Sequence, residues 1–234
     1  MHQLGDANGR TLLIVPGAFT TWQAMRPVLD GLQDFRLLVA SLPGHDPQQA
    51  VDFTTVSEVA DDIAVQIPEG HVDYGLGFSI GGMILAEMVS RRLVSLDRAI
   101  LDSPSTQRSA LVGWVMRRLM AVEVRNRLAG RPPRLPVLPH SAHLYADLSP
   151  ASLDAVLRES FGHHLPAAGL PPDVAVEVWY GEKEMAIHGT ASFRNLIRTT
   201  PQATARIFPG GGHGTLMFEQ PARYTRAARA FFAQ

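Results

Sequence analysis

The sequence predicts an α/β fold, in which a mostly parallel β-sheet is covered by helices on both faces. Short, continuously apolar runs typical of strands buried on both faces recur along the chain, and stretches with helical spacing separate them. Strands that alternate with helices form right-handed βαβ units, which place the strands parallel in one sheet. At 234 residues, 46% of them hydrophobic, the chain is most simply one large domain with a small insertion.

The expected elements follow from these runs. We expect strands over residues 11–15, 35–40, 72–77, 98–102, 174–180 and 204–208. We expect helices over residues 21–32, 55–67, 80–93 and 221–233. Ser57, three positions before Ala60, is interpreted as the start signal of the second helix.

One segment interrupts the alternation of strands and helices. Residues 105–172 carry no strand signal but contain helical runs at 109–128 and 150–161, joined by a proline-rich link. An excursion of about 70 residues from a compact sheet is usually a lid or a functional loop. We therefore expect residues 1–104 and 173–234 to form the core and residues 105–172 to form a helical lid insertion.

Composition excludes several functional classes. The net charge of −1 gives no reason to expect a nucleic-acid partner, and the absence of cysteine excludes disulfides, thiolate nucleophiles and cysteine-bound metal. No apolar stretch has the length of a membrane span, and the first apolar run is too short for a signal-peptide core. We expect a cytoplasmic protein without a membrane partner.

A glycine-flanked serine is the main functional signal. The stretch GFSIGG places Ser79 two positions after Gly77 and two before Gly81, directly after an expected strand and at the start of an expected helix. The pattern alone is weak, but this context is the one that a nucleophile elbow requires. Small neighbours let the backbones approach closely, and the helix N-terminus places N–H groups where negative charge develops.

Five stretches, taken in order, resemble the α/β-hydrolase superfamily over nearly the whole chain. They are LLIVPGAFTTW, ASLPGHDPQ, GFSIGG, VWYGEKEMA and FPGGGHGTLMFEQP. The resemblance implies the α/β-hydrolase fold and a nucleophile, an acid and a histidine in that chain order. It implies no metal or organic cofactor.

The resemblance assigns the triad to Ser79, Glu184 and His213. His213 lies in a glycine-rich loop between the last expected strand and the last helix, and Glu184 follows the strand before, where the family more often has Asp. A serine hydroxyl needs a base to take its proton, and the base needs a third group to orient it. Two other acids remain open: Glu182, and Asp102, which ends the strand after the elbow and is otherwise interpreted as a turn cap.

The oxyanion hole is expected to consist of backbone N–H groups. Ile80, the residue after the nucleophile, supplies one by geometry. By resemblance, the second comes from Ala18 or Phe19, in the loop after the first strand. Pro16 stands where the family usually has His; the donor follows Gly17 and is expected to persist without that bracing side chain.

The lid is expected to shape the substrate pocket through Trp114, Met116 and Met120. Its first helix also carries basic residues, which we interpret as the solvated face of an amphipathic helix. The alternative is that they attract an anionic substrate or an acidic carrier protein. These residues are Arg117, Arg118, Arg125 and Arg127.

The remaining histidines suggest a metal site only weakly. His140, His143, His163 and His164 lie near the proline-rich link without a neighbouring carboxylate cluster, so we expect no metal. The sequence thus predicts hydrolysis of a small ester-type acyl substrate through an acyl-enzyme. A thioesterase, a lactonase or a C–C bond hydrolase would use the same residues, and a non-catalytic ligand receptor is the competing class.

Overall fold

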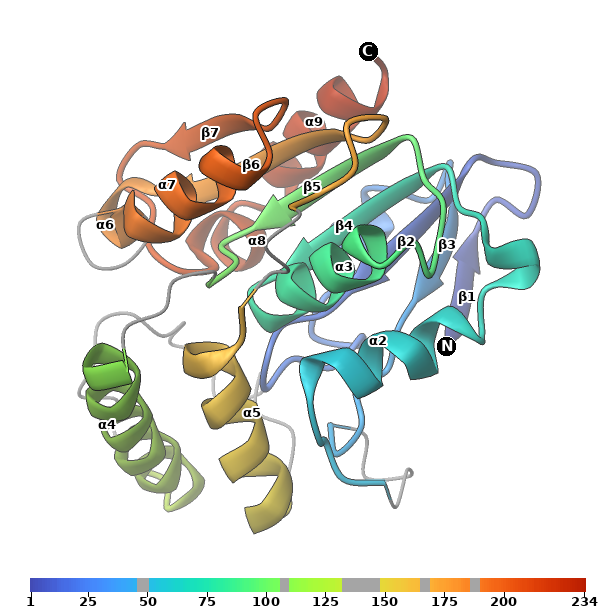
Figure 1. The fold of residues 1–234 in the computed structure, drawn as a ribbon. Helices are drawn as coiled ribbons and strands as arrows, with labels where there is room; N and C mark the ends of the chain where they lie inside the picture. The colour runs from blue at the N-terminus through green and yellow to red at the C-terminus, as the bar shows by residue number, and fades with distance from the viewer. Residues whose placement is uncertain (46–50, 106–109, 132–147, 165–168, 186–189) are drawn as a thin grey trace.

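The computed structural model describes residues 1–45, 51–105, 110–131, 148–164, 169–185 and 190–234. Its sheet has seven strands in the order β1-β3-β2-β4-β5-β6-β7, and every pair is parallel except β1 with β3 (Figure 1). The strands are β1 (His2–Gly5), β2 (Thr11–Val15), β3 (Arg36–Val39), β4 (Tyr74–Phe78), β5 (Arg98–Asp102), β6 (Ala175–Gly181) and β7 (Thr204–Phe208). The α/β prediction is confirmed, and all six expected strands form.

The sequence did not indicate β1. This strand pairs antiparallel with β3 at the edge of the sheet, and its residues alternate between half-buried and exposed positions. An edge strand with one dry face lacks the continuous apolar run that marks the inner strands.

Helices cover both faces of the sheet because neighbouring residues of a strand point to opposite sides. Leu12 and Ile14 of β2 pack with one layer of helices, whereas Leu13 and Val15 pack with the other. The first layer consists of α1 (Arg26–Asp30), α8 (Thr215–Glu219) and α9 (Pro221–Phe232). The second includes α2 (Val56–Ala64), α3 (Ile80–Ser90) and α7 (Thr190–Thr199) (Figure 1).

The start of α2 corrects one expectation. Thr55, not Ser57, is the N-cap: its hydroxyl accepts the Glu58 N–H at 3.1 Å and also bonds the Glu58 carboxylate. A threonine followed three residues later by glutamate is the sequence signature of a helix start, a stronger signal than a serine alone. Ser57 lies inside the helix and donates to Glu87 of α3.

The expected lid segment contains two helices between β5 and β6. These are α4 (Ala110–Leu128) and α5 (Pro150–Gly162), which pack on each other beyond the carboxyl ends of β4 and β5 (Figure 1). Ser152 ties α5 to the core, since its hydroxyl donates to Asp52 at 2.8 Å and accepts the Phe53 N–H at 3.0 Å. The other elements are short: η1 (Pro68–Gly70) and α6 (Glu182–Glu184).

The apolar face expected on α4 does not pack inward as one surface. Leu111 is 72% exposed and Trp114 is 53% exposed, and Val115, Leu119 and Val122 are also exposed. The side chains of Met116 and Met120 lie outside the described residues. Among the described helices, none combines the length and apolar character that a bilayer crossing requires.

Candidate active site

Ser79 lies in a strained turn between β4 and α3. Its backbone has φ 54° and ψ −120°, a conformation that costs a residue with a side chain on the order of 1–3 kcal/mol. Its N–H donates to the Asp102 carbonyl at 2.7 Å, so the end of β5 fixes the turn. The turn directs the serine away from the sheet at the N-terminus of α3.

Two glycines make this turn possible. A Cβ on Gly77 would lie 2.4 Å from the Gly81 carbonyl oxygen. A Cβ on Gly81 would lie 2.2 Å from the Val15 oxygen and 2.3 Å from that of Pro16. The start of α3 therefore packs directly against the end of β2, which brings the loop after β2 next to Ser79.

A hydrogen-bonded chain joins Ser79 to His213 and Glu184. The Ser79 Oγ lies 3.1 Å from His213 Nε2, and His213 Nδ1 lies 2.6 Å from Glu184 Oε1. Glu184 is only 1% exposed. Because Glu184 accepts a hydrogen bond from the Nδ1–H group, His213 presents the Nε2 lone pair to the serine hydroxyl, as a general base requires.

The second oxygen of Glu184 is also fully engaged. Its Oε2 accepts the Gly181 N–H at 2.9 Å and the Ser103 hydroxyl at 2.9 Å. The rival Glu182 is exposed, and its carboxylate accepts the Gly210 N–H. The rival Asp102 is buried and bonds Ser103 rather than His213 or the backbone of its own turn.

The charges of the pair reinforce each other. Burial alone would raise the pKa of Glu184, but His213 and the hydrogen bonds from Gly181 and Ser103 lower the pKa overall. Burial alone would lower the pKa of His213, but the charge and hydrogen bond of Glu184 raise it overall. Glu184 is therefore ionised, and it stabilises the imidazolium that forms when His213 takes a proton.

The loop after β2 adjoins the elbow. Gly17 packs on the Phe78 ring, where a Cβ would come within 2.5 Å, and a turn closes as the Thr20 N–H donates to the Gly17 carbonyl. Phe19 has a positive φ of 62° and a buried side chain. Ile80 begins α3, so its N–H has no partner within the helix. The expected oxyanion donors thus lie on two segments in contact.

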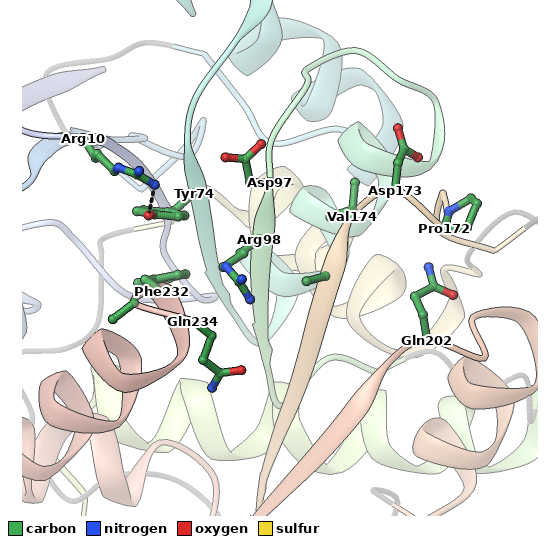
Figure 2. Close-up of a pocket in the computed structure, with 12 residues that line it drawn as sticks. Arg10, Tyr74, Asp97, Arg98, Pro172, Asp173, Val174, Gln202, Phe232 and Gln234 are labelled. Atoms are coloured by element: carbon green, nitrogen blue, oxygen red, sulfur yellow. Dashed lines mark hydrogen bonds between the residues drawn. The ribbon is translucent and has the colours of Figure 1, made fainter.

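A hollow of about 850 Å³ lies at the opposite edge of the sheet (Figure 2). Tyr74, Arg98 and Ala175, at the amino ends of β4, β5 and β6, line it together with Arg10 and Phe232. Ligands of open α/β sheets bind at the carboxyl ends of the strands. The hollow therefore lies apart from the chain of Ser79, His213 and Glu184.

The expected pocket and metal residues are only partly described. Trp114 lies under the Arg118 guanidinium, 5.2 Å from the ring centre, and no described contact joins Trp114 to the triad residues. His140 and His143 lie outside the described residues, and His163 approaches Glu87 of α3 at 3.5 Å. Within the described ranges, no group of three or more histidines and acids is placed to hold a metal ion.

A serine elbow at the carboxyl edge of a mostly parallel, helix-covered sheet defines the α/β-hydrolase class. The chain belongs to this class, because the protein-family model described as "Alpha/beta hydrolase family" matches residues 12–227.

Similar proteins share the fold at low sequence identity. A protein from Desulfitobacterium hafniense, described as of the alpha/beta hydrolase family, superposes with a TM-score of 0.84 at 23% identity, covering 98% of each chain. A thermophilic esterase from Thermogutta terrifontis superposes with a TM-score of 0.76 at 22% identity, covering 99% of this chain and 92% of the esterase.

One curated relative aligns over part of its length. A pimeloyl-[acyl-carrier protein] methyl ester esterase from Pectobacterium carotovorum is 27% identical over 113 residues, which are 48% of this chain and 44% of that protein. The aligned stretch is thus less than half of the relative.

Proposed function

We propose that the protein is a serine hydrolase that cleaves a small ester-type substrate through an acyl-enzyme. The observation that carries this proposal is the continuous hydrogen-bonded chain from Ser79 through His213 to the buried Glu184. The similarity to a thermophilic esterase and to a methyl ester esterase supports the ester class.

The geometry supports a two-step acyl transfer. Ser79 Oγ attacks the carbonyl carbon while His213 Nε2 takes the hydroxyl proton, and Glu184 stabilises the resulting imidazolium. The oxyanion accepts hydrogen bonds from the N–H groups of Ile80 and of Ala18 or Phe19. His213 then returns the proton to the leaving alcohol, and water, activated by the same base, releases the acid and regenerates Ser79.

Labelling with a fluorophosphonate tests this proposal. We expect one phosphonyl group per chain on Ser79, and we expect Ser79→Ala to abolish both labelling and ester turnover, because loss of a triad nucleophile costs several orders of magnitude in kcat. Ser90→Ala is the matched control, since this serine donates only to the Gly169 carbonyl. Labelling elsewhere, or turnover by Ser79→Ala, contradicts the proposal.

A substrate panel separates the reactions that one triad can perform. Small carboxylic esters are the expected substrates, and thioesters, lactones and β-diketones test the thioesterase, lactonase and C–C hydrolase alternatives. A protein that binds these compounds but neither turns them over nor reacts with the phosphonate is a ligand receptor.

A second candidate substrate is an acyl group on an acidic carrier protein. The exposed surface of α4 combines apolar side chains such as Leu111 and Trp114 with Arg118 and Arg125, both exposed, and suits an acidic partner. The name of the partial relative points to the same substrate class. Arg118→Gln with Arg125→Gln should then lower kcat/KM for carrier-bound esters at low salt only, and leave free esters unchanged.

A further inference from the structure

A hydroxyl group lies between two buried carboxyl groups behind the triad. The Ser103 Oγ is 2.9 Å from Asp102 Oδ1 and 2.9 Å from Glu184 Oε2. Ser103 and Asp102 are 2% and 7% exposed, so water has little access to either side chain. Two hydrogen bonds therefore meet at one hydroxyl oxygen.

Counting protons assigns the direction of both bonds. A serine hydroxyl carries one proton and can donate to one carboxyl group only. Glu184 is ionised and already accepts His213 Nδ1–H and Gly181 N–H, so it accepts the Ser103 proton as well. The contact between Ser103 and Asp102 then requires a second proton, which can come only from Asp102.

We propose that Asp102 is a protonated carboxylic acid that donates to Ser103, and that Ser103 in turn donates to Glu184 and positions the triad acid. Asp102 and Ser103 are thus positioning residues, and neither touches the reacting atoms. This proposal rests on the proposed function for its effect on catalysis, but not for the proton on Asp102.

The backbone at Ser103 supports a positioning role. Ser103 has a positive φ of 54°, although glycine would adopt this conformation without strain. Its N–H donates to the Trp179 carbonyl of β6 at 2.8 Å, which holds the residue between the ends of β5 and β6. A serine at this position supplies a hydroxyl that glycine lacks. Backbone strain of this kind usually persists where it serves a function.

The surroundings of Asp102 favour the neutral acid. Burial, and then the charge of Glu184, raise the pKa of Asp102 to about 7. The other titratable groups that face it are His213, the Tyr224 phenol of α9 and the Tyr180 phenol of β6. The Tyr224 hydroxyl faces Asp102 and lowers its pKa, as the charge of His213 does, but burial and the charge of Glu184 outweigh both; the Tyr180 hydroxyl donates to the Pro104 carbonyl. Of these groups, only His213 can carry a positive charge, and its Nδ1–H already donates a hydrogen bond to Glu184.

Infrared difference spectroscopy tests the proton directly. Spectra of the wild-type protein at about pH 5.5 and about pH 9, on either side of the Asp102 pKa, should show a protonated-carboxyl C=O band that is lost at the higher pH. We expect Asp102→Asn to lack this band and the matched variant Asp97→Asn, at an exposed position just before the opposite, amino end of β5, to retain it. A wild-type spectrum without a band assigned to Asp102 overturns the proposal. This readout needs no turnover, so it fails independently of the proposed function.

Kinetics test the positioning role. Ser103→Ala should lower kcat roughly 10- to 100-fold with little change in KM. This is the effect expected when a group that orients a residue of the triad is removed. Asp102→Asn keeps a donor toward Ser103 and should lose much less kcat than Asp102→Ala. Because a protonated Asp102 carries no charge, Asp102→Asn should leave the midpoint of the acid limb of kcat/KM, which reports His213, close to that of the wild type.

Two outcomes contradict the positioning role. One is a Ser103→Ala protein with wild-type kcat and pH profile, and the other is equal kcat for Asp102→Asn and Asp102→Ala. If Asp102→Ala fails to fold, Ser103→Gly decides instead, because it removes the same hydroxyl while relieving the positive φ. A folded Ser103→Gly protein with undiminished kcat would overturn the proposal.

Discussion

His213 Nδ1 lies 2.6 Å from Glu184 Oε1, although 29 positions separate the two residues in the chain. The intervening segment forms α7 and β7, which return the chain to the carboxyl edge of the sheet. The loop after β7 then docks on the turn that carries the acid, since the Lys183 N–H donates to the Gly211 carbonyl and Glu182 accepts the Gly210 N–H. The distance between the acid and the histidine is thus set by two adjacent strand ends.

The triad acid can be tested with two glutamates two positions apart. Glu184→Gln should lower kcat by at least about 100-fold, because the imidazole loses both its orienting acceptor and the charge that stabilises its protonated form. Glu182→Gln is the matched control and should change kcat little, since its carboxylate bonds the Gly210 N–H at an exposed site. Steady-state kinetics give the ranking, and the reverse order would exclude Glu184 as the acid.

The pH dependence of kcat/KM reports His213. The imidazole must be neutral to accept a proton, so activity should fall as pH drops through the raised pKa of His213. The midpoint of this acid limb should therefore lie above about 6.5, the ordinary histidine value. In Glu184→Gln the residual activity should show a lower midpoint. A midpoint unmoved by this substitution would mean that Glu184 does not set the pKa of His213.

The same pair affects stability in a defined pH window. The lowered pKa of Glu184 contributes stability that is present above about 4.5 and lost as pH falls through the folded value. The raised pKa of His213 contributes stability that is present below about 6.5 and lost as pH rises through the folded value. Urea unfolding of wild type and Glu184→Gln should differ more at about pH 5.5 than at about pH 8.5. An equal difference at both pH values would refute this linkage.

Gly81→Ala should damage both the fold and the site. Its Cβ would meet the Val15 and Pro16 carbonyl oxygens, so α3 must move away from β2, at a cost of about 1–3 kcal/mol in the free energy of unfolding. Displacing the helix start also moves Ile80 and Ser79, and phosphonate labelling should slow. Gly162→Ala, where no atom lies within 4 Å of the added Cβ, is the control and should not destabilise. Equal stability of the two variants would refute the close packing.

The N-cap of α2 predicts a smaller effect. Thr55→Ala should reduce the free energy of unfolding by about 1 kcal/mol, because the Glu58 N–H loses its acceptor. Thr54→Ala, at the preceding position, should change it by less than about 0.5 kcal/mol. Denaturant titrations of both variants test whether Thr55 begins the helix. A larger loss for Thr54→Ala would place the cap one residue earlier.

The local pattern of the sequence was sufficient to predict the inner part of the fold. Buried strands and amphipathic helices differ in the period of their apolar residues, and this difference is visible in one dimension. The edge strand β1 was not predicted because only one of its faces is partly buried. The helix α7 was not predicted because most of its residues are polar. The exposed side chains on α4 had the right period, but periodicity does not say which neighbour covers a face.

The elbow at Ser79 was also visible in the sequence, because a strained turn needs glycines at fixed positions around the serine. The partner of the histidine was not. Asp102 ends β5 and Glu184 follows the neighbouring β6, so both lie at the same edge of the sheet. Only the tertiary structure distinguishes them: the Glu184 carboxylate bonds the His213 imidazole, whereas the Asp102 carboxyl group bonds the Ser103 hydroxyl. The positive φ of Ser103 is not indicated by any pattern in the sequence. The choice depends on directions in space between groups far apart in the chain, and hydrogen bonds are selected by those directions rather than by residue type.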